Sequence, residues 1–477
     1  MNFCQESSIL ADHLVARNDG TVELSLEMKP SCDFADFVES VRCCTQNISS
    51  LHVHNMFLKE LKANEQADIL NALHGLKEIY ISYVSLPVRL LANLLVRCSK
   101  QLQILSLERI VLLAEAHDSP SHDDAVFFSA LQSLEALEDL HISVSSTVAV
   151  PEGQKLFFQV DDVFDTVFQS LSGTTTLKKL YVSIGQNLAG RTNIQPQTLG
   201  KLLHGSAIND LTLVHFPLHK EHCQAIVSAK VNLKSLSLIK AGFGDEGAIA
   251  LAEGLTGNDR SLESLSLPGN KLTDMGGSMI VKAFSVPDAS FKLKALDVHG
   301  NHFTAAFGKQ LAILLTTKSK MSCLDVSNNQ LEDEGVQAIV MALRKNSTLT
   351  QLNLFATQLT NKSCESFAGL FRVNTTLKRL NLYNNENISS QGIQVLAEAV
   401  KEHNCFLERL EVSRNKFEGD FGLDMYLRLN REYGRGKMLS SPATNELEYV
   451  NGIHRAVAKN DLDSMFYFIH AKPSLCC

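Results

Sequence analysis

Residues Leu324 to Leu359 read LDVSNNQLEDEGVQAIVMALRKNSTLTQLNLFATQL, and this stretch decides how the chain folds. It begins with the apolar residues Leu324 and Val326, continues with a helical pattern, and returns to the opening pattern at Leu352, 28 residues after Leu324. A fixed period of this size is typical of repeat proteins, because one unit cannot bury its apolar face alone and must stack on its neighbours. The stretch therefore predicts a solenoid whose units each contain a strand and a helix.

The same apolar position, which we call the anchor, recurs along the whole chain. From Leu236 onward the anchors are 29, 31, 28, 28, 28 and 30 residues apart, whereas the earlier spacings vary from 25 to 40. The extra length falls within residues 108–165, around 110–124 and 143–161, which we expect to be exposed loops. The 14 anchors are Leu24, Leu51, Ile79, Leu105, Leu140, Leu180, Leu211, Leu236, Leu265, Leu296, Leu324, Leu352, Leu380 and Leu410.

Within each repeat the residue types fit a short strand followed by a turn and a helix. Leu residues around the anchor alternate with polar residues, so the Leu side chains share one face of a strand. An Asn five residues after the anchor is expected to bond the backbone of the adjacent turn, and Asp245, Asp274 and Asp333 are expected to cap the helices that they precede. Since each strand returns after a helix, the strands are expected to be parallel. The turn residues are Asn270, Asn301, Asn329, Asn385 and Asn415.

The segments LSLPGNKLTD, LDVSNNQLEDEGVQAIVMAL and LNLYNNENISSQGIQVLAEAV resemble leucine-rich repeats of the ribonuclease-inhibitor type. The resemblance is strong over residues 233–417 and weaker over 21–213. It implies an α/β solenoid, a horseshoe with a parallel sheet on the concave face and helices on the convex face. It also implies that the protein binds another protein and has no catalytic activity of its own.

The ends of a solenoid need caps, because the last repeats would otherwise expose their cores. We expect a helical cap over residues 1–20, leucine-rich repeats over 21–418, and a helical cap over 419–477. The segment IHRAVAKNDLDSMFYFIHAKPS near the end also resembles one ankyrin-type helix pair. A single such pair is too small to stand alone, so the cap is the preferred interpretation.

Composition narrows the classes of partner and the compartment. The 44 basic and 52 acidic residues give a net charge of −8, which argues against a general nucleic-acid surface. No apolar run is long enough to span a membrane, and the first residues lack the pattern of a signal peptide. The 11 cysteines include no CxxC pair, and we expect reduced thiols in a cytoplasmic protein.

Few motifs point to an enzyme or to a cofactor. Gly242, Gly244 and Gly247 spell GxGxxG between a strand and a helix, but the repeat register places Phe243 in the core and Asp245 at a cap position. No GxxxxGK[ST] or GxSxG motif occurs, so neither nucleotide hydrolysis nor a serine hydrolase is indicated. We expect no cofactor and no small-molecule substrate.

Two groups have the atoms of a metal site but an incomplete set of ligands. His52 and His54 are expected to share one face of a strand, without a third ligand. His219, His222 and Cys223 have helical spacing, without a second pair of ligands. Exposed histidines and ordinary core residues explain both groups, and we expect no metal site at either.

The candidate binding residues are those that the repeat register turns away from the core. In the second half of the chain Phe355 and Tyr383 hold equivalent positions and are expected to stack, as Arg379 and Arg409 are expected to be neighbours. Aromatic side chains beside Arg are frequent in interaction hot spots, although the same residues also occur as surface decoration that keeps a repeat protein in solution. The predicted partner-binding residues are Asp297, His299, Asp325, Asn353, Phe355, Arg379, Asn381, Tyr383, Arg409, Glu411 and Arg414.

A weaker candidate lies in the first half, at Glu78, Tyr80, Tyr83, Glu108, Arg109, His141 and Tyr181. The preferred function is a non-catalytic scaffold that binds a protein partner across the concave face of the solenoid, with no nucleic-acid or membrane partner. The alternative is an activator of a small GTPase, a class that also uses this repeat type; its usual acidic tail is replaced here by a basic stretch at 428–437. An enzyme would need a reactive constellation, and the nearest one is Asp297, His299 and Asp325, which has no nucleophile.

Overall fold

The computed structural model describes the strands and helices of most repeats. The described residues are 14–16, 22–27, 48–54, 73, 75–113, 120–144, 163–185, 193–229, 231–257, 261–285, 292–317, 320–412, 423–433, 445–459, 461 and 464. The chain divides into two compact units, which are treated separately. Unit 1 comprises Met1–Phe243 with Gly257–Ser261, and unit 2 comprises Gly244–Thr256 with Leu262–Cys477.

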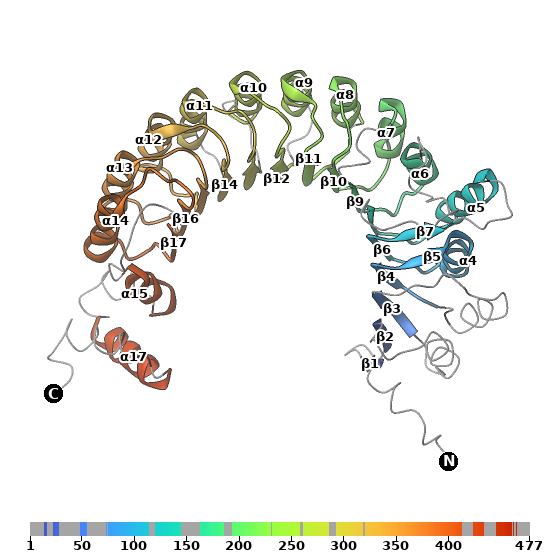
Figure 1. Ribbon diagram of the computed structural model, residues 1–477, viewed down its shortest axis with the longest axis horizontal. Coiled ribbons are helices and arrows are strands. Elements are labelled where there is room, and N and C mark those ends of the chain that lie inside the picture. Colours follow the sequence, from blue (N-terminus) through green and yellow to red (C-terminus); the bar gives the residue numbers. More distant parts are fainter. Residues whose placement is uncertain are drawn as a thin grey trace, which may run out of the picture. The chain divides into compact units, whose positions relative to one another are not determined.

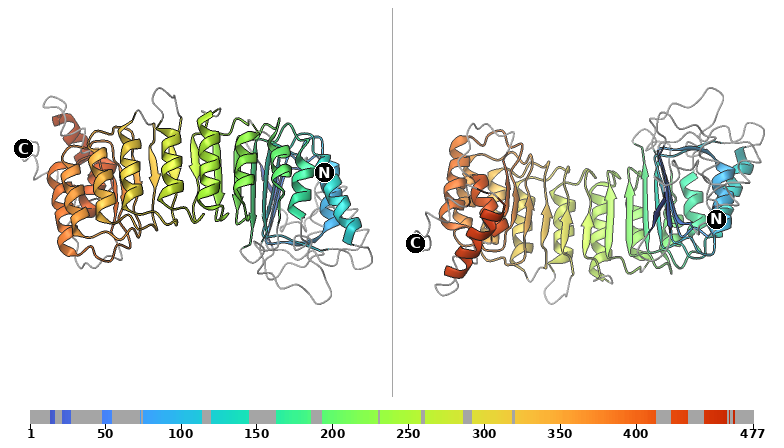
Figure 2. Two further views of the ribbon diagram at one scale, coloured as in Figure 1. Left: turned by 90° about the horizontal axis from the view of Figure 1, so that it is seen from above. Right: turned by 90° about the horizontal axis from the view of Figure 1, so that it is seen from below.

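In unit 1 the main sheet has the strand order β1-β2-β3-β4-β6-β8-β9-β10-β11, and all neighbours are parallel apart from the antiparallel pair β1–β2. The described helices lie on one face of this sheet (Figures 1 and 2). The strands are β1 (Leu14–Ala16), β2 (Val22–Glu27), β3 (Ile48–His54), β4 (Glu78–Ser82), β6 (Ile104–Glu108), β8 (Asp139–Val144), β9 (Lys179–Ile184), β10 (Asp210–Val214) and β11 (Ser235–Ile239). The helices are α4 (Val88–Cys98), α5 (Pro120–Gln132), α6 (Val163–Leu171), α7 (Pro196–Leu203) and α8 (Lys220–Ser228).

Unit 2 repeats one strand and one helix with little variation. Its strands run in the order β12-β13-β14-β15-β16-β17, all parallel, and the helices that precede and separate these strands lie on one face of the sheet (Figure 1). The strands are β12 (Ser264–Ser266), β13 (Ala295–Asp297), β14 (Cys323–Asp325), β15 (Gln351–Asn353), β16 (Arg379–Asn381) and β17 (Arg409–Glu411). The helices are α9 (Gly244–Gly257), α10 (Asp274–Phe284), α11 (Ala305–Thr316), α12 (Glu332–Leu343), α13 (Asn361–Phe371), α14 (Ser390–His403), α15 (Leu423–Arg428), the π-helical η3 (Leu429–Tyr433) and α17 (Asn445–Ala458).

The strand register confirms the anchors predicted from the sequence. In unit 1 each anchor pairs with the next one along the sheet, from Leu24 to Leu236. In unit 2 the same holds from Leu265 to Leu410. From Leu51 onward no anchor is more than 7% exposed. The apolar period therefore fixes the pairing, because a slip by one residue would turn each of these side chains to solvent.

Buried Asn side chains connect the turns of successive repeats, as the sequence predicts. The amide of Asn329 donates to the carbonyls of Val298, Val326 and Ser327, and its Oδ1 accepts the Phe303 N–H at 3.1 Å. Asn270, Asn301 and Asn385 are also buried at their turns, whereas Asn415 lies outside the described residues. These amides satisfy backbone groups that strand pairing leaves open.

A second series of Asn side chains was not expected from the sequence. Asn346, Asn374 and Asn404 each donate to a carbonyl at the end of the preceding repeat's helix, namely Leu315, Leu343 and Phe371. The four last carbonyls of a helix have no partner within it, so these amides satisfy groups that would otherwise be open. The signal in the sequence is an Asn 22 to 24 residues after the anchor.

The prediction that Asp245, Asp274 and Asp333 cap their own helices is wrong. Thr273, Thr304 and Thr360 are the N-cap residues of α10, α11 and α13, and each hydroxyl accepts from its own helix. Asp245, Asp274 and Asp333 instead hold the N-cap Thr of the following repeat, to which their carboxylates are bonded. The carboxylates therefore connect successive repeats and do not cap the N-termini of their own helices.

Some of the irregular segments differ from the prediction. Within 110–124, Val111–Leu113 form β7, which pairs with β5 (Ser85–Pro87) in a small second sheet, and α5 already begins at Pro120. Residues 145–162 lie outside the described part. Of the expected N-terminal helical cap only Leu14–Ala16 are described, and they form β1. In the expected C-terminal cap the described residues are helical, as α15, η3 and α17.

None of the helices in the described part of the chain combines the length and the apolar character needed to cross a membrane.

Candidate functional site

Three rows of side chains run across the strands of unit 2, on the side away from the helices, and together we call them the strand face of unit 2. The strand register places the members of each row on neighbouring strands. The row at the strand ends contains Ser266, Asp297, Asp325, Asn353, Asn381 and Glu411. The row two residues earlier contains Cys323, Gln351, Arg379 and Arg409, and the row two residues later contains His299, Ser327, Phe355 and Tyr383.

The acidic and amide residues of the first row have a structural role. Each accepts the backbone N–H of the residue two positions later, in the pairs Asp297–His299, Asp325–Ser327, Asn353–Phe355 and Asn381–Tyr383, at 2.9 to 3.1 Å. Such a bond turns the chain out of the strand. This role explains the oxygen acceptor at these positions, but it does not require a charge.

The aromatic pair predicted from the sequence is confirmed. The rings of Phe355 and Tyr383 stack with centroids 5.5 Å apart and planes 16° apart. Both side chains are half-buried. A parallel pair at this separation is a rigid apolar surface that loses little side-chain entropy when it is covered.

The two Arg side chains lie on neighbouring strands, since Arg379 pairs with Arg409 in the register. Both are exposed. Arg409 Nε is 2.6 Å from Glu411 Oε1, whereas Arg379 has no ion pair within the described residues. Arg414 lies outside the described part of the chain. The face therefore carries cations near β16 and β17 and carboxylates near β13 and β14.

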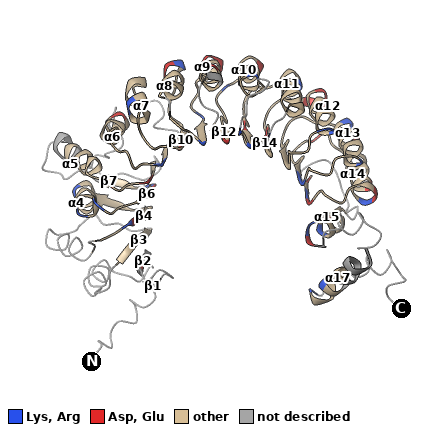
Figure 3. Cartoon of the chain, turned by 180° about the vertical axis from the view of Figure 1, so that it is seen from behind, with Lys and Arg blue, Asp and Glu red and all other residues tan. Residues whose placement is uncertain are grey.

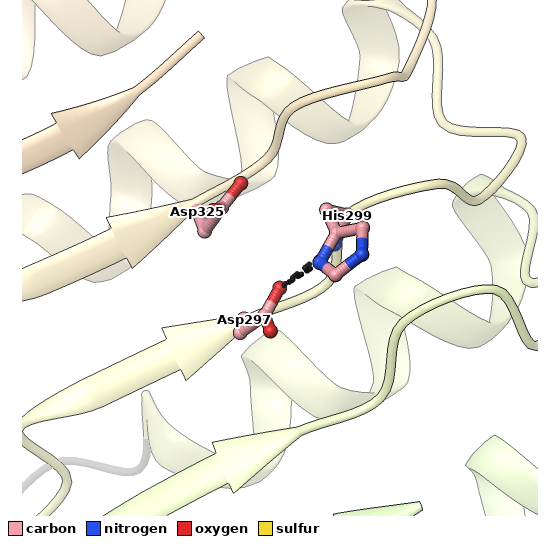
Figure 4. A group of neighbouring side chains, drawn as sticks. All are labelled: Asp297, His299 and Asp325. Atoms are coloured by element: carbon pink, nitrogen blue, oxygen red, sulfur yellow. Dashed lines mark hydrogen bonds and ion pairs between the residues drawn. The ribbon is translucent and has the colours of Figure 1, made fainter. Parts of the chain in front are cut away.

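Asp297, His299 and Asp325 lie together at the ends of β13 and β14 (Figure 4). His299 Nδ1–H donates to Asp297 Oδ1 at 2.8 Å, and the Ser266 hydroxyl donates to Oδ2 at 3.0 Å. Burial alone would raise the pKa of Asp297, but the hydrogen bonds from His299 and Ser266 and the His299 charge outweigh it and lower that pKa. The Asp297 carboxyl is therefore ionised at neutral pH.

Asp325 is held by a different set of donors. Its Oδ1 accepts the Ser327 N–H at 2.9 Å and the Ser327 hydroxyl at 2.6 Å, and its Oδ2 accepts from Asn353 Nδ2 at 2.6 Å. Ser266 and Ser327 were not among the residues predicted from the sequence. The sequence marks these two serines only by their register positions on the strand face. The prediction considered mainly charged and aromatic residues and therefore missed them.

Cys323 is the one cysteine in the three rows of the strand face of unit 2. It precedes Leu324 on β14 and is half-buried. Burial, followed by the charges of Asp325 and Asp297, raises the pKa of its thiol. A raised pKa leaves less of the reactive thiolate at neutral pH, so this thiol is less reactive than a cysteine with the ordinary pKa.

The weaker candidate in unit 1 also brings its aromatic residues together. His141 and Tyr181 stack at 4.1 Å, and Tyr80 stacks on His52 at 4.4 Å. The Arg109 guanidinium lies 5.1 Å from the centre of the Tyr83 ring. Glu78 and Glu108 lie on the neighbouring strands β4 and β6.

The two histidine groups considered as metal sites are occupied by other contacts. His52 lies against Glu23 and Tyr80, and His54 Nδ1 is 2.6 Å from the Ser82 hydroxyl. His222 is buried, accepts the N–H of His219 at its Nδ1, and donates to the Ile194 carbonyl through Nε2. Burial is the main reason that the pKa of His222 is lowered. Among the described residues, only Asp297, His299 and Asp325 form a group of three with metal-ligand geometry.

Both signs of charge are spread over the helices of unit 2 (Figure 3). Exposed ion pairs such as Lys309–Glu334 contribute to this pattern. A surface of this kind keeps a repeat protein in solution and offers no continuous basic stripe along these helices.

Comparison with known proteins identifies the repeats. A family model described as "Leucine Rich repeat" matches residues 229–252, 258–281, 317–340 and 373–397. No curated protein sequence matches the chain. The matched segments span both units and include the strand and helix of several repeats.

Three solved structures are similar in their chain trace. An internalin (inlF) from Listeria monocytogenes is 16% identical over 82% of this chain and 86% of its own, with a TM-score of 0.42. In the yeast Rad7 and Elc1 complex the matched chain is 12% identical over 80% of this chain and 75% of its own, with a TM-score of 0.36. The actin-binding site 2 of leiomodin-1 is 19% identical over 39% of this chain and 91% of its own, with a TM-score of 0.26.

Proposed function

Because the chain is a leucine-rich repeat protein, we propose that it is a non-catalytic scaffold that binds another protein through the strand face of unit 2. The observation that carries the proposal is the Phe355–Tyr383 stack, a preformed apolar surface between Asp325 and Arg379. Aromatic and Arg side chains contribute most of the energy in protein interfaces, and charged residues around them set the orientation. The further members of the proposed surface are Asp297, His299, Asn353, Asn381, Arg409, Glu411 and Arg414.

The proposed binding mechanism is contact with a rigid surface. The Asn353 and Asn381 turns fix the backbone of Phe355 and Tyr383 by hydrogen bonds of 3.1 and 2.9 Å. A surface that is already ordered loses less conformational entropy when a partner covers it. The partner therefore gains affinity from apolar area on the stack and gains specificity from the flanking charges.

Two further assignments belong to this proposal. We place the repeats in the ribonuclease-inhibitor-like subclass, which is supported by periods of 28 to 31 residues from Leu236 onward and by a full helix in each repeat of unit 2. We also propose a cytoplasmic location, supported by Cys98, Cys223, Cys323 and Cys364, which form no disulfide. No observation on the described residues favours the GTPase-activating alternative.

The test compares the wild-type chain with the double variant Phe355→Ala/Tyr383→Ala. Each is used to capture proteins from native lysate, and the dissociation constant of each captured protein is then measured with purified components. We expect the double variant to bind at least about 30-fold more weakly, since loss of a hot spot costs about 2 kcal/mol or more. Thermal unfolding of both chains checks that the variant is folded.

The matched control is Met275→Ala/Met341→Ala, which removes two exposed apolar side chains from the helices of unit 2. This double variant removes apolar side chains from the helices, opposite the strand face of unit 2. We expect its affinity for the partner to equal that of the wild type. A partner that tolerates the loss of the stack but not the loss of the two Met side chains would place binding on the helices and would refute the proposal.

A further inference from the structure

Three side chains on adjacent strands of unit 2 present metal-ligating atoms to one another. One oxygen of Asp297, one oxygen of Asp325 and one ring nitrogen of His299 all lie within 4.8 Å of each other. All three side chains are half-buried at the ends of β13 and β14 (Figure 4). His299 Nδ1 is hydrogen-bonded to Asp297 Oδ1 at 2.8 Å, so a bound ion would take the place of the proton between these two atoms.

The structural role of the two carboxylates does not account for their charge. Asn353 and Asn381 hold the equivalent positions on the next two strands and make the same turn with a neutral amide oxygen. The backbone hydrogen bond that closes the turn at Asp297 and at Asp325 would therefore also form with Asn, although Asn at position 325 would lose the oxygen that accepts from Asn353 Nδ2. Two carboxylates, Asp297 and Asp325, instead lie on neighbouring strands, with the His299 imidazole beside them.

No Lys or Arg of the described residues forms an ion pair with Asp297 or Asp325, and His299 is the one basic side chain at hydrogen-bonding distance. Other carboxylates of unit 2 are paired with a cation, for example Glu263 with Lys294 and Glu408 with Lys378. His299 forms an ion pair with Asp297 when it is protonated and so offsets at most one of the two carboxylate charges, whereas a divalent cation would offset both. The group thus has the charge and the geometry of a cation site.

We propose that Asp297, His299 and Asp325 bind a zinc ion. The set of one imidazole nitrogen and two carboxylate oxygens is typical of Zn²⁺, whereas Mg²⁺ and Ca²⁺ select oxygen ligands. Coordination through Nδ1 replaces the proton that His299 now donates to Asp297. The neighbouring Ser266, Ser327 and Asn353 orient the carboxylate oxygens by hydrogen bonds of 3.0, 2.6 and 2.6 Å.

Three protein ligands would leave one coordination position of a tetrahedral ion open. An open position accepts water or a side chain of a bound partner. Zinc binding itself requires only these residues of the chain, so this inference stands or falls independently of the proposed scaffold function.

The test uses the purified full-length chain, stripped with a chelator and titrated with zinc chloride by calorimetry. We expect one zinc ion per chain at this site. Asp325→Asn keeps the oxygen acceptor that the turn needs, as Asn353 shows, and His299→Ala removes the nitrogen ligand. We expect each variant to bind zinc at least about tenfold more weakly, with an unchanged thermal unfolding profile in chelator.

The matched control is His302→Ala, which removes an exposed histidine of the same repeat that is outside the group. We expect its zinc affinity to equal that of the wild type. The absence of zinc binding in the wild-type chain, or an affinity that Asp325→Asn leaves unchanged, would overturn the proposal.

Cobalt provides a second readout that separates this site from binding at cysteines. Cobalt bound by nitrogen and oxygen ligands lacks the thiolate charge-transfer band that sulfur ligands produce. We expect visible absorption without that band, lost in Asp325→Asn. A strong thiolate band that persists in Asp325→Asn would assign the ion to cysteines and would refute the site. The Phe355→Ala/Tyr383→Ala capture, done in chelator, tests the scaffold function separately.

Discussion

The carboxylate of Asp333 holds Thr360, the N-cap residue of the helix in the following repeat. Oδ1 accepts the Thr360 backbone N–H at 3.0 Å, and Oδ2 accepts its hydroxyl at 2.6 Å. The Ser363 hydroxyl donates to the same carboxylate at 2.6 Å. This contact joins two repeats at the start of α13, where unsatisfied N–H groups and the helix dipole favour a negative charge.

The Asp333 contact makes stability depend on pH. Burial alone would raise the pKa of Asp333, but hydrogen bonds from Ser363 and Thr360 lower it below its ordinary value of 3.8. Because the folded-state pKa is depressed, its contribution is complete above the unfolded-state pKa of about 3.9 and is lost as the pH falls through the folded-state value. We expect Asp333→Asn to unfold about 1 kcal/mol more easily at pH 7, with a smaller difference from wild type below pH 3.8.

Urea unfolding at a series of pH values measures this effect. The control is Glu365→Gln, which changes an exposed carboxylate on α13 that has no hydrogen bond among the described residues. The free energy of unfolding of Glu365→Gln should equal that of the wild type at every pH. A destabilisation by Asp333→Asn that stays constant down to pH 2 would show that the charge is not the cause.

Replacing Asn329 with Ala tests the amide series. The substitution removes three donated bonds and leaves the buried N–H of Phe303 without its acceptor. Since an unsatisfied buried polar group costs about 1 to 3 kcal/mol, we expect a loss of at least about 2 kcal/mol in the free energy of unfolding. The exposed neighbour Gln330 is the control, and Gln330→Ala should stay within about 0.5 kcal/mol of wild type. Equal effects at the two positions would contradict the role assigned to Asn329.

Substitution by Ala is expected to change the stability of the protein in opposite directions at two helix glycines of unit 2. A Cβ at Gly308 would lie 2.7 Å from backbone atoms of Gly335 on the adjacent helix, whereas a Cβ at Gly369 would meet nothing within 4 Å. Gly308→Ala therefore forces α11 and α12 apart and should destabilise the protein by about 2 kcal/mol. Gly369→Ala should stabilise it by about 0.5 to 1 kcal/mol, because Ala has less freedom in the unfolded chain. Thermal unfolding of both variants measures the two signs, and stabilisation by Gly308→Ala would show that the helices are not in contact there.

Two buried cysteines should resist alkylation in the folded protein. Burial is the main cause that raises the pKa of Cys223 and of Cys364 to about 12. At pH 7.5 the thiolate fraction is then on the order of 10⁻⁴ to 10⁻⁵. Labelling with iodoacetamide followed by peptide mass spectrometry should modify the half-buried Cys405 well before these two, and all three should react alike in urea. Rapid labelling of Cys364 without denaturant would show that α13 opens readily.

The repeat register was predictable from the sequence because it depends on one physical quantity, the burial of an apolar side chain at a fixed interval. Each anchor from Leu24 to Leu236 and from Leu265 to Leu410 pairs with the next as the spacing predicts. The same argument placed Phe355 and Tyr383 side by side, since residues at equal distances from their anchors must be neighbours in a parallel sheet. Contacts between equivalent positions of successive repeats therefore follow from the spacing alone.

Contacts between positions that are not equivalent did not follow from the sequence. Asp333 lies in the first turn of α12 and was expected to cap it, yet its carboxylate reaches Thr360 in the next repeat. Likewise, β7 lies in a segment that was expected to be a loop because of its extra length. It forms a strand because the preceding repeat supplies its pairing partner, β5. The sequence by itself determined the period, the strand order and the outward-facing residues, which depend on burial. Only the tertiary structure decided which polar groups at unequal positions meet across repeats, such as Asp333 and Thr360, because hydrogen bonds depend on distance and direction and the period constrains neither for such side chains.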